Sequence, residues 1–109
     1  MKVIILPKAL QYLDKIAFIL FEKQYFSYLE TSIRYVDDLI DDINANLAKK
    51  QHKPAPPYYD EYGKKLYYAV FKKNKRTSYY VFFSKYNNNG QIVYLICYIG
   101  NNHTEAQHL

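Results

Sequence analysis

The segment KKNKRTSYYVFF, residues 72–83, places four cations next to a run of aromatic and β-branched side chains. The cations are Lys72, Lys73, Lys75 and Arg76, and Tyr80 lies in the aromatic run. Cations can hold phosphate groups while aromatic rings stack on bases, so a surface with both suits single-stranded nucleic acid. An ordinary hairpin with a charged tip would also use these residues, because Tyr and Phe favour strands. The residues alone leave both interpretations open.

Three histidines and one cysteine are the other side chains with evident chemistry: His52, His103, His108 and Cys97. Structural zinc usually requires four closely spaced ligands, so these residues predict no metal site. No cofactor is expected, because the three glycines do not cluster into a phosphate-binding loop. Cys97 lies in an apolar run, which predicts a small buried side chain rather than a nucleophile. By residue type alone, His103 is expected to be a solvated surface histidine.

Charge is distributed unevenly along the chain, whose net charge is +5. Residues 1–48 carry five basic and seven acidic side chains, whereas residues 49–109 carry ten basic and three acidic ones. Ten of the fourteen tyrosines also lie between residues 58 and 98. The acidic first half and the basic, tyrosine-rich second half predict two surfaces with different partners.

The length of 109 residues predicts a single domain, 1–109. The opening apolar stretch is interrupted by Pro7, Lys8 and Asp14, so no secretory leader is predicted. No segment reaches the roughly 20 apolar residues that a membrane-spanning helix needs, and the lone cysteine fits a reducing compartment. We therefore expect a soluble, cytoplasmic protein that does not act at a membrane.

The first half of the chain predicts one strand and two helices. KVIIL (2–6) is a β-branched run that ends at Pro7, a residue suited to the first turn of a helix, and apolar residues recur at helical spacing over 8–24. Ser27 with Glu30 three residues later predicts a capping box. The second helix is predicted from an apolar seam: Phe26, Leu29, Ile33, Val36, Ile40, Ile43 and Leu47.

The second half predicts a loop and three strands. Residues 49–63 hold three prolines in four positions and are expected to form an extended loop. Strands are expected at 66–73, 76–84 and 91–99, with a hairpin turn at 85–90 and a polar tail at 100–109. The order β-α-α-β-β-β predicts an α+β fold, in which a helical hairpin packs on one face of a small antiparallel sheet.

The side chains that share a face follow from the register of the first hairpin. A two-residue turn at Asn74 and Lys75 would pair Lys73 with Arg76 and Val70 with Tyr79. Alternation would then direct six side chains toward the helices: Leu66, Tyr68, Val70, Tyr79, Val81 and Phe83. The opposite face would carry Tyr67, Ala69, Phe71, Lys73, Arg76, Ser78, Tyr80 and Phe82. Cations and aromatic rings would thus share one open face.

The element order and several segments resemble the RelE/ParE superfamily of bacterial toxins. The segments are KVIILPKALQYLDKI at the start, the two consecutive helices, NKRTSYYVFF, and QIVYLICYIGNNHTEAQHL at the end. The resemblance covers nearly the whole chain. It implies the toxin component of a type II toxin–antitoxin system, neutralised by a cognate antitoxin protein.

The resemblance implies either of two activities. RelE-like members cut ribosome-bound mRNA without a metal, by attack of a 2′-hydroxyl on the adjacent phosphate. For that activity, position along the chain assigns Arg76, His103 and Lys73 to catalysis. It assigns Lys64, Lys65, Lys72, Lys75 and Tyr80 to nucleic-acid binding.

ParE-like members inhibit DNA gyrase without enzymatic activity, and this alternative stays open. The tail after Tyr98 contains neither Arg nor Tyr, whereas mRNA-cleaving relatives carry both near the C-terminus. A non-toxic binding module of the same fold is the third interpretation. The expected partners are therefore an antitoxin and either ribosome-bound mRNA or DNA gyrase.

Overall fold

Residues 1–109 are described by a computed structural model with an α+β architecture, three α-helices and a five-stranded mixed sheet. The elements are β1 (Lys2–Ile5), α1 (Pro7–Glu22), α2 (Leu29–Asn46), β2 (Lys53–Pro54), β3 (Tyr67–Lys72), β4 (Ser78–Asn88), β5 (Gln91–Asn101) and α3 (Asn102–Glu105). Three 3-10 helices, η1 (Leu47–Lys49), η2 (Pro57–Tyr59) and η3 (Ala106–His108), complete the chain. The predicted strands and long helices are all present.

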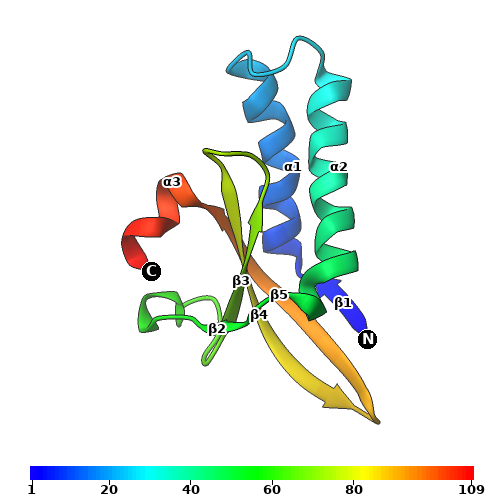
Figure 1. Cartoon of the computed structure of the whole chain (residues 1–109), viewed down its shortest axis with the longest axis vertical. Coiled ribbons are helices and arrows are strands. Elements are labelled where there is room, and N and C mark those ends of the chain that lie inside the picture. Colours follow the sequence, from blue (N-terminus) through cyan, green and yellow to red (C-terminus); the bar gives the residue numbers. More distant parts are fainter.

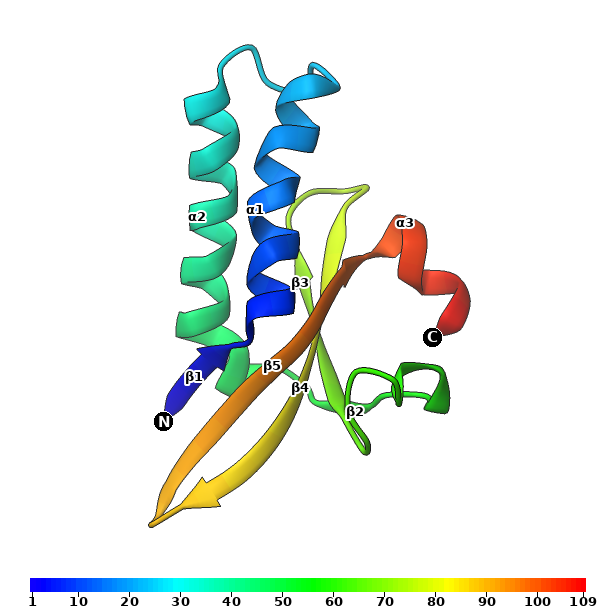
Figure 2. The ribbon, with the colours of Figure 1, turned by 180° about the vertical axis from the view of Figure 1, so that it is seen from behind.

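The sheet has the order β1-β5-β4-β3-β2 (Figures 1 and 2). β1 runs parallel to β5, while the other neighbours are antiparallel. The prediction of a purely antiparallel sheet is therefore wrong at this edge. The long helical connection between β1 and the later strands makes the parallel pairing possible, because parallel strands need a crossover.

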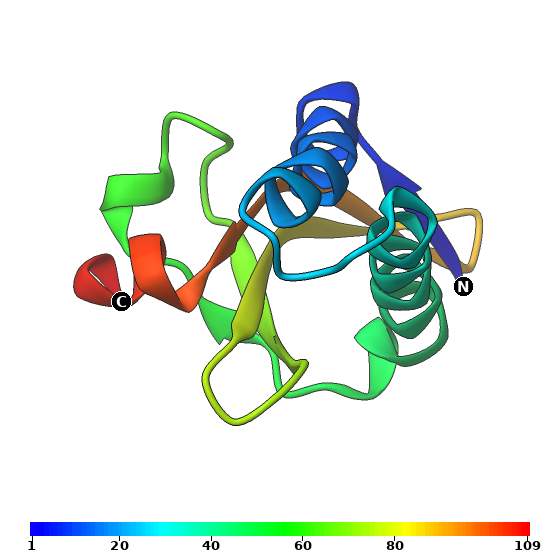
Figure 3. The ribbon, with the colours of Figure 1, turned by 90° about the horizontal axis from the view of Figure 1, so that it is seen from above.

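The helices α1 and α2 form an antiparallel hairpin on one side of the sheet, as Figure 3 shows from above. α1 begins at Pro7, whose missing N–H costs nothing in a first turn. Its buried side chains are Ala9, Leu13, Ile16 and Ala17. They pack into a helix-side core with buried residues of α2 and of the three central strands.

The predicted capping box at the start of α2 is absent. Tyr28 occupies the N-cap position and no side chain caps the helix, while Ser27 is exposed. Phe26 instead packs against the ring of Tyr35, with ring centroids 5.5 Å apart. The backbone becomes helical only after Tyr28, so Ser27 lies too far outside the first turn to reach its N–H groups.

The buried stripe of α2 also differs from the predicted seam. The buried residues of the helix are Ser32, Val36, Leu39 and Ile43. Ile33, predicted to be in the seam, is 43% exposed. The stripe is rotated because α2 must contact α1 and the sheet at once, which a simple two-helix seam does not anticipate. A small polar residue, Ser32, takes the place predicted for isoleucine.

β3 and β4 pair one residue away from the predicted register. Val70 lies opposite Tyr80 rather than Tyr79. The predicted two-residue turn is a longer loop, closed by a hydrogen bond of 2.9 Å from the N–H of Lys73 to the carbonyl of Thr77. Since side chains alternate, this slip exchanges the two faces of β3 but leaves those of β4 as predicted.

The helix-side core accordingly contains Ala69 and Phe71, which were predicted on the opposite face. Tyr68 and Leu66, predicted to face the helices, belong to a second apolar cluster. On β4 the predicted alternation is confirmed, with Tyr79, Val81 and Phe83 buried in the helix-side core.

The second cluster shows that the predicted loop 49–63 is ordered structure. The segment contributes β2 and η2, and its Tyr59 is buried in the second cluster with Leu66 and Phe82. The Tyr59 ring stacks on Phe82, with ring centroids 4.1 Å apart. The sheet face that was expected to be open is thus partly covered by the chain itself.

The turn between β4 and β5 is tighter than predicted. Instead of a loop over 85–90, the strands continue to Asn88 and restart at Gln91. Asn89 and Gly90 adopt left-handed backbone angles, φ 52° and 87°, as a two-residue hairpin turn requires.

None of the helices combines the length and the apolar character needed to cross a membrane.

Replacing Ser32 by alanine is expected to raise the free energy of unfolding by about 1 kcal/mol. The Ser32 hydroxyl is buried and has no hydrogen-bond partner, so it has lost water without compensation. Urea denaturation measures the change. Thr31→Ala is the control, because exposed Thr31 offers a similar gain in helix propensity without a buried hydroxyl. A Ser32→Ala protein no more stable than Thr31→Ala would contradict the prediction.

Candidate functional site

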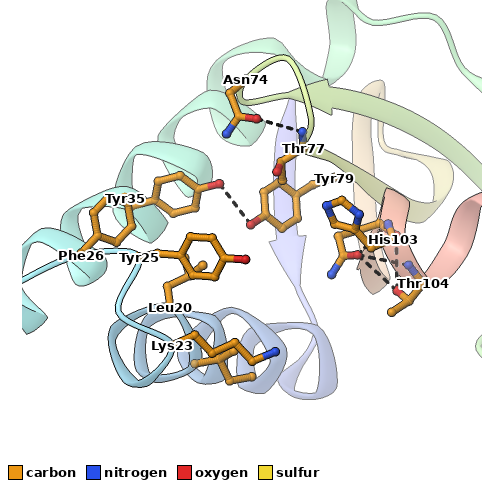
Figure 4. A pocket seen from close by; sticks show the side chains of 12 residues that line it. Leu20, Lys23, Tyr25, Phe26, Tyr35, Asn74, Thr77, Tyr79, His103 and Thr104 are labelled. Carbon is orange, nitrogen blue, oxygen red and sulfur yellow. Dashed lines mark hydrogen bonds between the residues drawn. The ribbon is translucent and has the colours of Figure 1, made fainter.

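A cleft of about 590 Å³ opens between the end of α1, the α1–α2 connection, the β3–β4 turn and the start of α3 (Figure 4). Its walls are formed by Ile19, Leu20, Lys23, Tyr25, Phe26, Tyr35, Asn74, Thr77, Tyr79, Asn101, His103 and Thr104. None of these residues carries a carboxylate, whereas lysine, histidine, hydroxyl and amide groups are all present. The cleft therefore favours an anionic ligand over a cationic one.

The end of α1 supplies one wall of the cleft. Lys23 is the C-cap of the helix, and its N–H donates to the carbonyl of Ile19 at 2.9 Å. The next residue, Gln24, adopts a left-handed φ of 61°, which turns the chain back. Tyr25 N–H then donates to the Leu20 carbonyl at 3.0 Å. This reversal places Lys23 and Tyr25 at the rim, where Tyr25 is 70% exposed.

Two tyrosines from different layers meet inside the cleft. The hydroxyls of Tyr35 on α2 and Tyr79 on β4 lie 3.2 Å apart (Figure 4). Tyr79 is almost fully buried, and burial, followed by the contact with Tyr35, raises the pKa of its hydroxyl well above 10.0. Tyr79 is therefore a neutral hydroxyl at physiological pH, able to hydrogen-bond.

Lys73 extends the positive charge toward this tyrosine pair. Its Nζ atom lies 4.5 Å from the centroid of the Tyr35 ring, within the range of a cation–π contact. The prediction placed Lys73 on the sheet face opposite the helices. The longer turn instead directs it to the helix side, next to the cleft.

The β3–β4 turn is built around Asn74. Its Oδ1 atom accepts hydrogen bonds from the backbone N–H groups of Arg76 and Thr77, both at 2.9 Å. This local side-chain turn fixes the loop that carries Lys75 and Arg76, and both side chains are exposed on it. Asn74 and Thr77 also line the cleft, so the cationic turn forms its edge.

The C-terminal segment is tied to the same turn. Asn101 caps α3, accepting from the N–H groups of His103 and Thr104 at 2.9 and 3.2 Å. Asn102 accepts from Ser78 N–H at 2.9 Å and donates through Nδ2 to the Arg76 carbonyl at 3.0 Å. These bonds hold His103 beside the turn, so two predicted site residues 27 positions apart in the sequence, Arg76 and His103, share one edge of the molecule.

Other predicted site residues lie elsewhere. Lys64 and Lys65 are exposed before β3, about 20 Å from the turn by strand length. Tyr80 packs against the second apolar cluster, edge-on to Tyr68, on the side away from the cleft. Lys72 is exposed at the end of β3 and Lys75 on the turn. The predicted nucleic-acid surface is therefore divided among three places.

Sequence reasoning missed Lys23, Tyr25, Tyr35 and Tyr79 as cleft residues. Tyr79 alternates with the apolar residues of β4 and was correctly predicted in the core under the helices, but not at the wall of a cleft. Tyr35 was outside the predicted seam. No local pattern marks Lys23 or Tyr25, because their position depends on the left-handed residue that ends α1. Only the approach of β4 to the helical hairpin joins these side chains.

The histidines, Cys97 and the acidic residues form no metal centre, because no three of them come close enough to hold an ion. The Cys97 thiol donates weakly to the Leu95 carbonyl, and burial raises its pKa, so it stays a neutral thiol. Comparisons with protein-family models, curated proteins and solved structures find no match. The function must therefore be argued from the cleft.

Alkaline pH is expected to destabilise the fold, because burial raises the pKa of Tyr12, Tyr59, Tyr79 and Tyr98 above 10.0. Above pH 10 the unfolded chain releases protons that the folded chain retains, so stability falls as pH rises. Each such tyrosine contributes a slope of up to about 1.4 kcal/mol per pH unit. Thermal unfolding between pH 8 and 11.5 measures the slope.

The contribution of one group is tested by Tyr79→Phe, which should reduce the alkaline slope. Tyr86→Phe is the matched control, since Tyr86 is 47% exposed near the tip of the β4–β5 hairpin. Equal slopes in the Tyr79 variant and the control would show that burial of Tyr79 does not carry the effect.

Proposed function

We propose that the protein is the toxin of a type II toxin–antitoxin system and cuts ribosome-bound mRNA without a metal ion. The observation that carries the proposal is the carboxylate-free cleft, in which Lys23 and His103 lie next to the turn that bears Arg76. A polyanionic chain could follow this edge without meeting a negative side chain in the cleft. The resemblance to the RelE/ParE superfamily supports the same conclusion.

In the proposed reaction, the 2′-oxygen of one nucleotide attacks the adjacent phosphorus while the bond to the 5′-oxygen breaks. The products are a 2′,3′-cyclic phosphate and a 5′-hydroxyl end. His103 accepts the 2′-hydroxyl proton, and the leaving 5′-oxygen takes a proton from water at the open side of the cleft. Arg76, Lys23 and Lys73 stabilise the charge that develops on the phosphoryl oxygens.

The neutral hydroxyl of Tyr79 has a separate role in this proposal. It lies deeper than the lysines and can donate a hydrogen bond to a phosphoryl oxygen or a sugar hydroxyl. Tyr25, open at the rim, offers a ring on which a base can stack. An antitoxin that covers the turn and the cleft would block Lys73 and Arg76 together, which accounts for inhibition by one bound segment.

A gyrase inhibitor is the second candidate, favoured by exposed apolar side chains around the tip of the helical hairpin. They are Phe18, Ile19, Phe21, Tyr25 and Tyr28, with Tyr28 72% exposed. Such a patch suits contact with another protein, because large exposed apolar side chains gathered in one place often mark interfaces. In this candidate the cleft has no catalytic role.

Substituting the cations of the cleft and of the adjoining turn is expected to reduce mRNA cleavage while preserving the fold. Arg76→Ala should reduce codon-phased cuts on translated mRNA about 100-fold, as loss of a charge-stabilising donor usually does. Lys23→Ala should reduce them about tenfold, through lost phosphate binding. Mapping of mRNA 5′ ends after induction in a bacterial host measures both. Lys2→Ala is the control, because Lys2 is also exposed but lies on β1, which β5 and β4 separate from β3.

The same induction experiment separates the candidates. Intact mRNA together with altered plasmid supercoiling and an SOS response would replace the nuclease with the gyrase inhibitor. In that case Tyr28→Ser should relieve toxicity and Arg76→Ala should not. Unimpaired growth at full expression would indicate a non-toxic binding module.

A further inference from the structure

Glu105 is a buried carboxylate in α3, only 6% exposed, and the groups that donate hydrogen bonds to it are all hydroxyls. Tyr59 donates to Oε1 at 3.1 Å, Tyr98 donates to Oε2 at 3.1 Å, and Thr104 donates to Oε2 at 2.7 Å. A carboxylate leaves water only at a high cost unless such bonds replace its hydration. A buried glutamate in a short tail therefore requires an explanation.

The three hydroxyls come from three segments of the chain. Tyr59 belongs to η2, Tyr98 to β5 and Thr104 to α3 itself. Tyr59 also donates to the Glu105 carbonyl, at 3.4 Å. Glu105 thus links three parts of the chain: η2, which covers the second face of the sheet, strand β5, and the C-terminal tail. Burial, and after it the negative charge of Glu105, raises the pKa of Tyr59 and Tyr98, which keeps both as donors.

Gly100 makes room for this arrangement. A Cβ atom at residue 100 would lie 2.4 Å from Cγ and 2.7 Å from Cδ of Glu105. No side chain can occupy that space without displacing the glutamate. Gly100 lies opposite Tyr80 in the β4–β5 ladder, so the backbone there cannot move away easily. The absence of a side chain at residue 100 is thus coupled to the position of Glu105.

His103 lies two residues before Glu105 on the same short helix. The N-terminal end of α3 is held by Asn101, which accepts from His103 N–H, and by Asn102, which donates to the Arg76 carbonyl in the β3–β4 turn. Four helical residues alone are too few to stay folded in water. The C-terminal end of the helix is held at Glu105, and η3 follows it directly. The orientation of the His103 side chain toward the cleft therefore depends on anchors at both ends.

We propose that Glu105 is a positioning residue of the cleft: its hydroxyl-bound carboxylate anchors α3 and so holds His103 at the cleft wall. The inference rests on the proposed function for its catalytic consequence, but not for the anchoring itself. Thr104 is the cleft residue that donates to Glu105, and Glu105 itself does not line the cleft. It acts through the helix that carries His103.

Amide hydrogen exchange of the full chain tests the anchoring without any substrate. Glu105→Ala and Gly100→Ala should each increase exchange at the amides of His103 and Thr104 at least tenfold. Amides of the β4–β5 ladder near Val81 and Ile99 should keep their protection. Glu105→Gln retains the size and one oxygen acceptor, so it should restore most of the protection. Glu61→Ala is the control for loss of an exposed carboxylate.

Unchanged exchange at His103 in both Glu105→Ala and Gly100→Ala would overturn the proposal. If Glu105→Ala or Gly100→Ala also loses protection in the sheet, Tyr59→Phe and Tyr98→Phe are used instead. Each of these removes one donor to Glu105 and leaves the ring in place. Each single variant should increase amide exchange at His103 and Thr104 partly, and the double variant should increase it to the level expected for Glu105→Ala. No effect in the double variant would also overturn the anchoring.

The catalytic consequence is measured separately, on mRNA cleavage. Glu105→Ala should lower kcat about tenfold with little change in KM, and Glu105→Gln should recover most of kcat. If the tail is released in the Glu105 variant but the unmodified protein cleaves no mRNA, the proposed nuclease activity is refuted and the anchoring stands. Normal cleavage by a protein whose tail is released would refute the positioning role alone.

Discussion

The pairing of β3 with β4 is the constraint on which the rest of the molecule depends. Because the loop Lys73–Thr77 is longer than a two-residue turn, every side chain of β3 takes the face opposite to the one a tight hairpin would give. Ala69 and Phe71 then complete the core under the helices. The same loop carries Lys73 to the helix side, where its Nζ atom lies over the ring of Tyr35 on α2.

The two faces of the sheet are therefore both covered, but by different means. Two helices cover one face and bury most of the apolar residues. The other is covered by a proline-rich segment whose contribution is mainly Tyr59, stacked on Phe82 and bonded to Glu105. The second layer has little apolar area, so hydrogen bonds and ring stacking must stabilise it. The cleft opens where the first layer ends.

The sequence was sufficient to predict the longer elements, because period and turn residues are local properties, but β2, η2 and α3 lie in segments predicted as a loop and a tail. Strands β3, β4 and β5 and both long helices lie close to their predicted bounds. The register was not predictable, since it depends on Asn74 Oδ1 accepting from two backbone N–H groups. The same residue types also allow a two-residue turn. The cleft could not be found either, because Lys23, Tyr79 and His103 are joined only by tertiary packing. Arg76 and His103, chosen from position and resemblance, do lie at one edge.

The parallel pairing of β1 with β5 has a consequence for synthesis of the chain. Lys2 lies beside Val93 and Ile5 beside Ile96, so strands about ninety positions apart must meet to complete the sheet. Until β5 has left the ribosome, β1 and α1 lack a strand against which both of them pack. Contacts of such long sequence separation form late in folding. β1 and α1 thus stay without their partner strand, and open to a binding partner, until residues 91–101 have been synthesised.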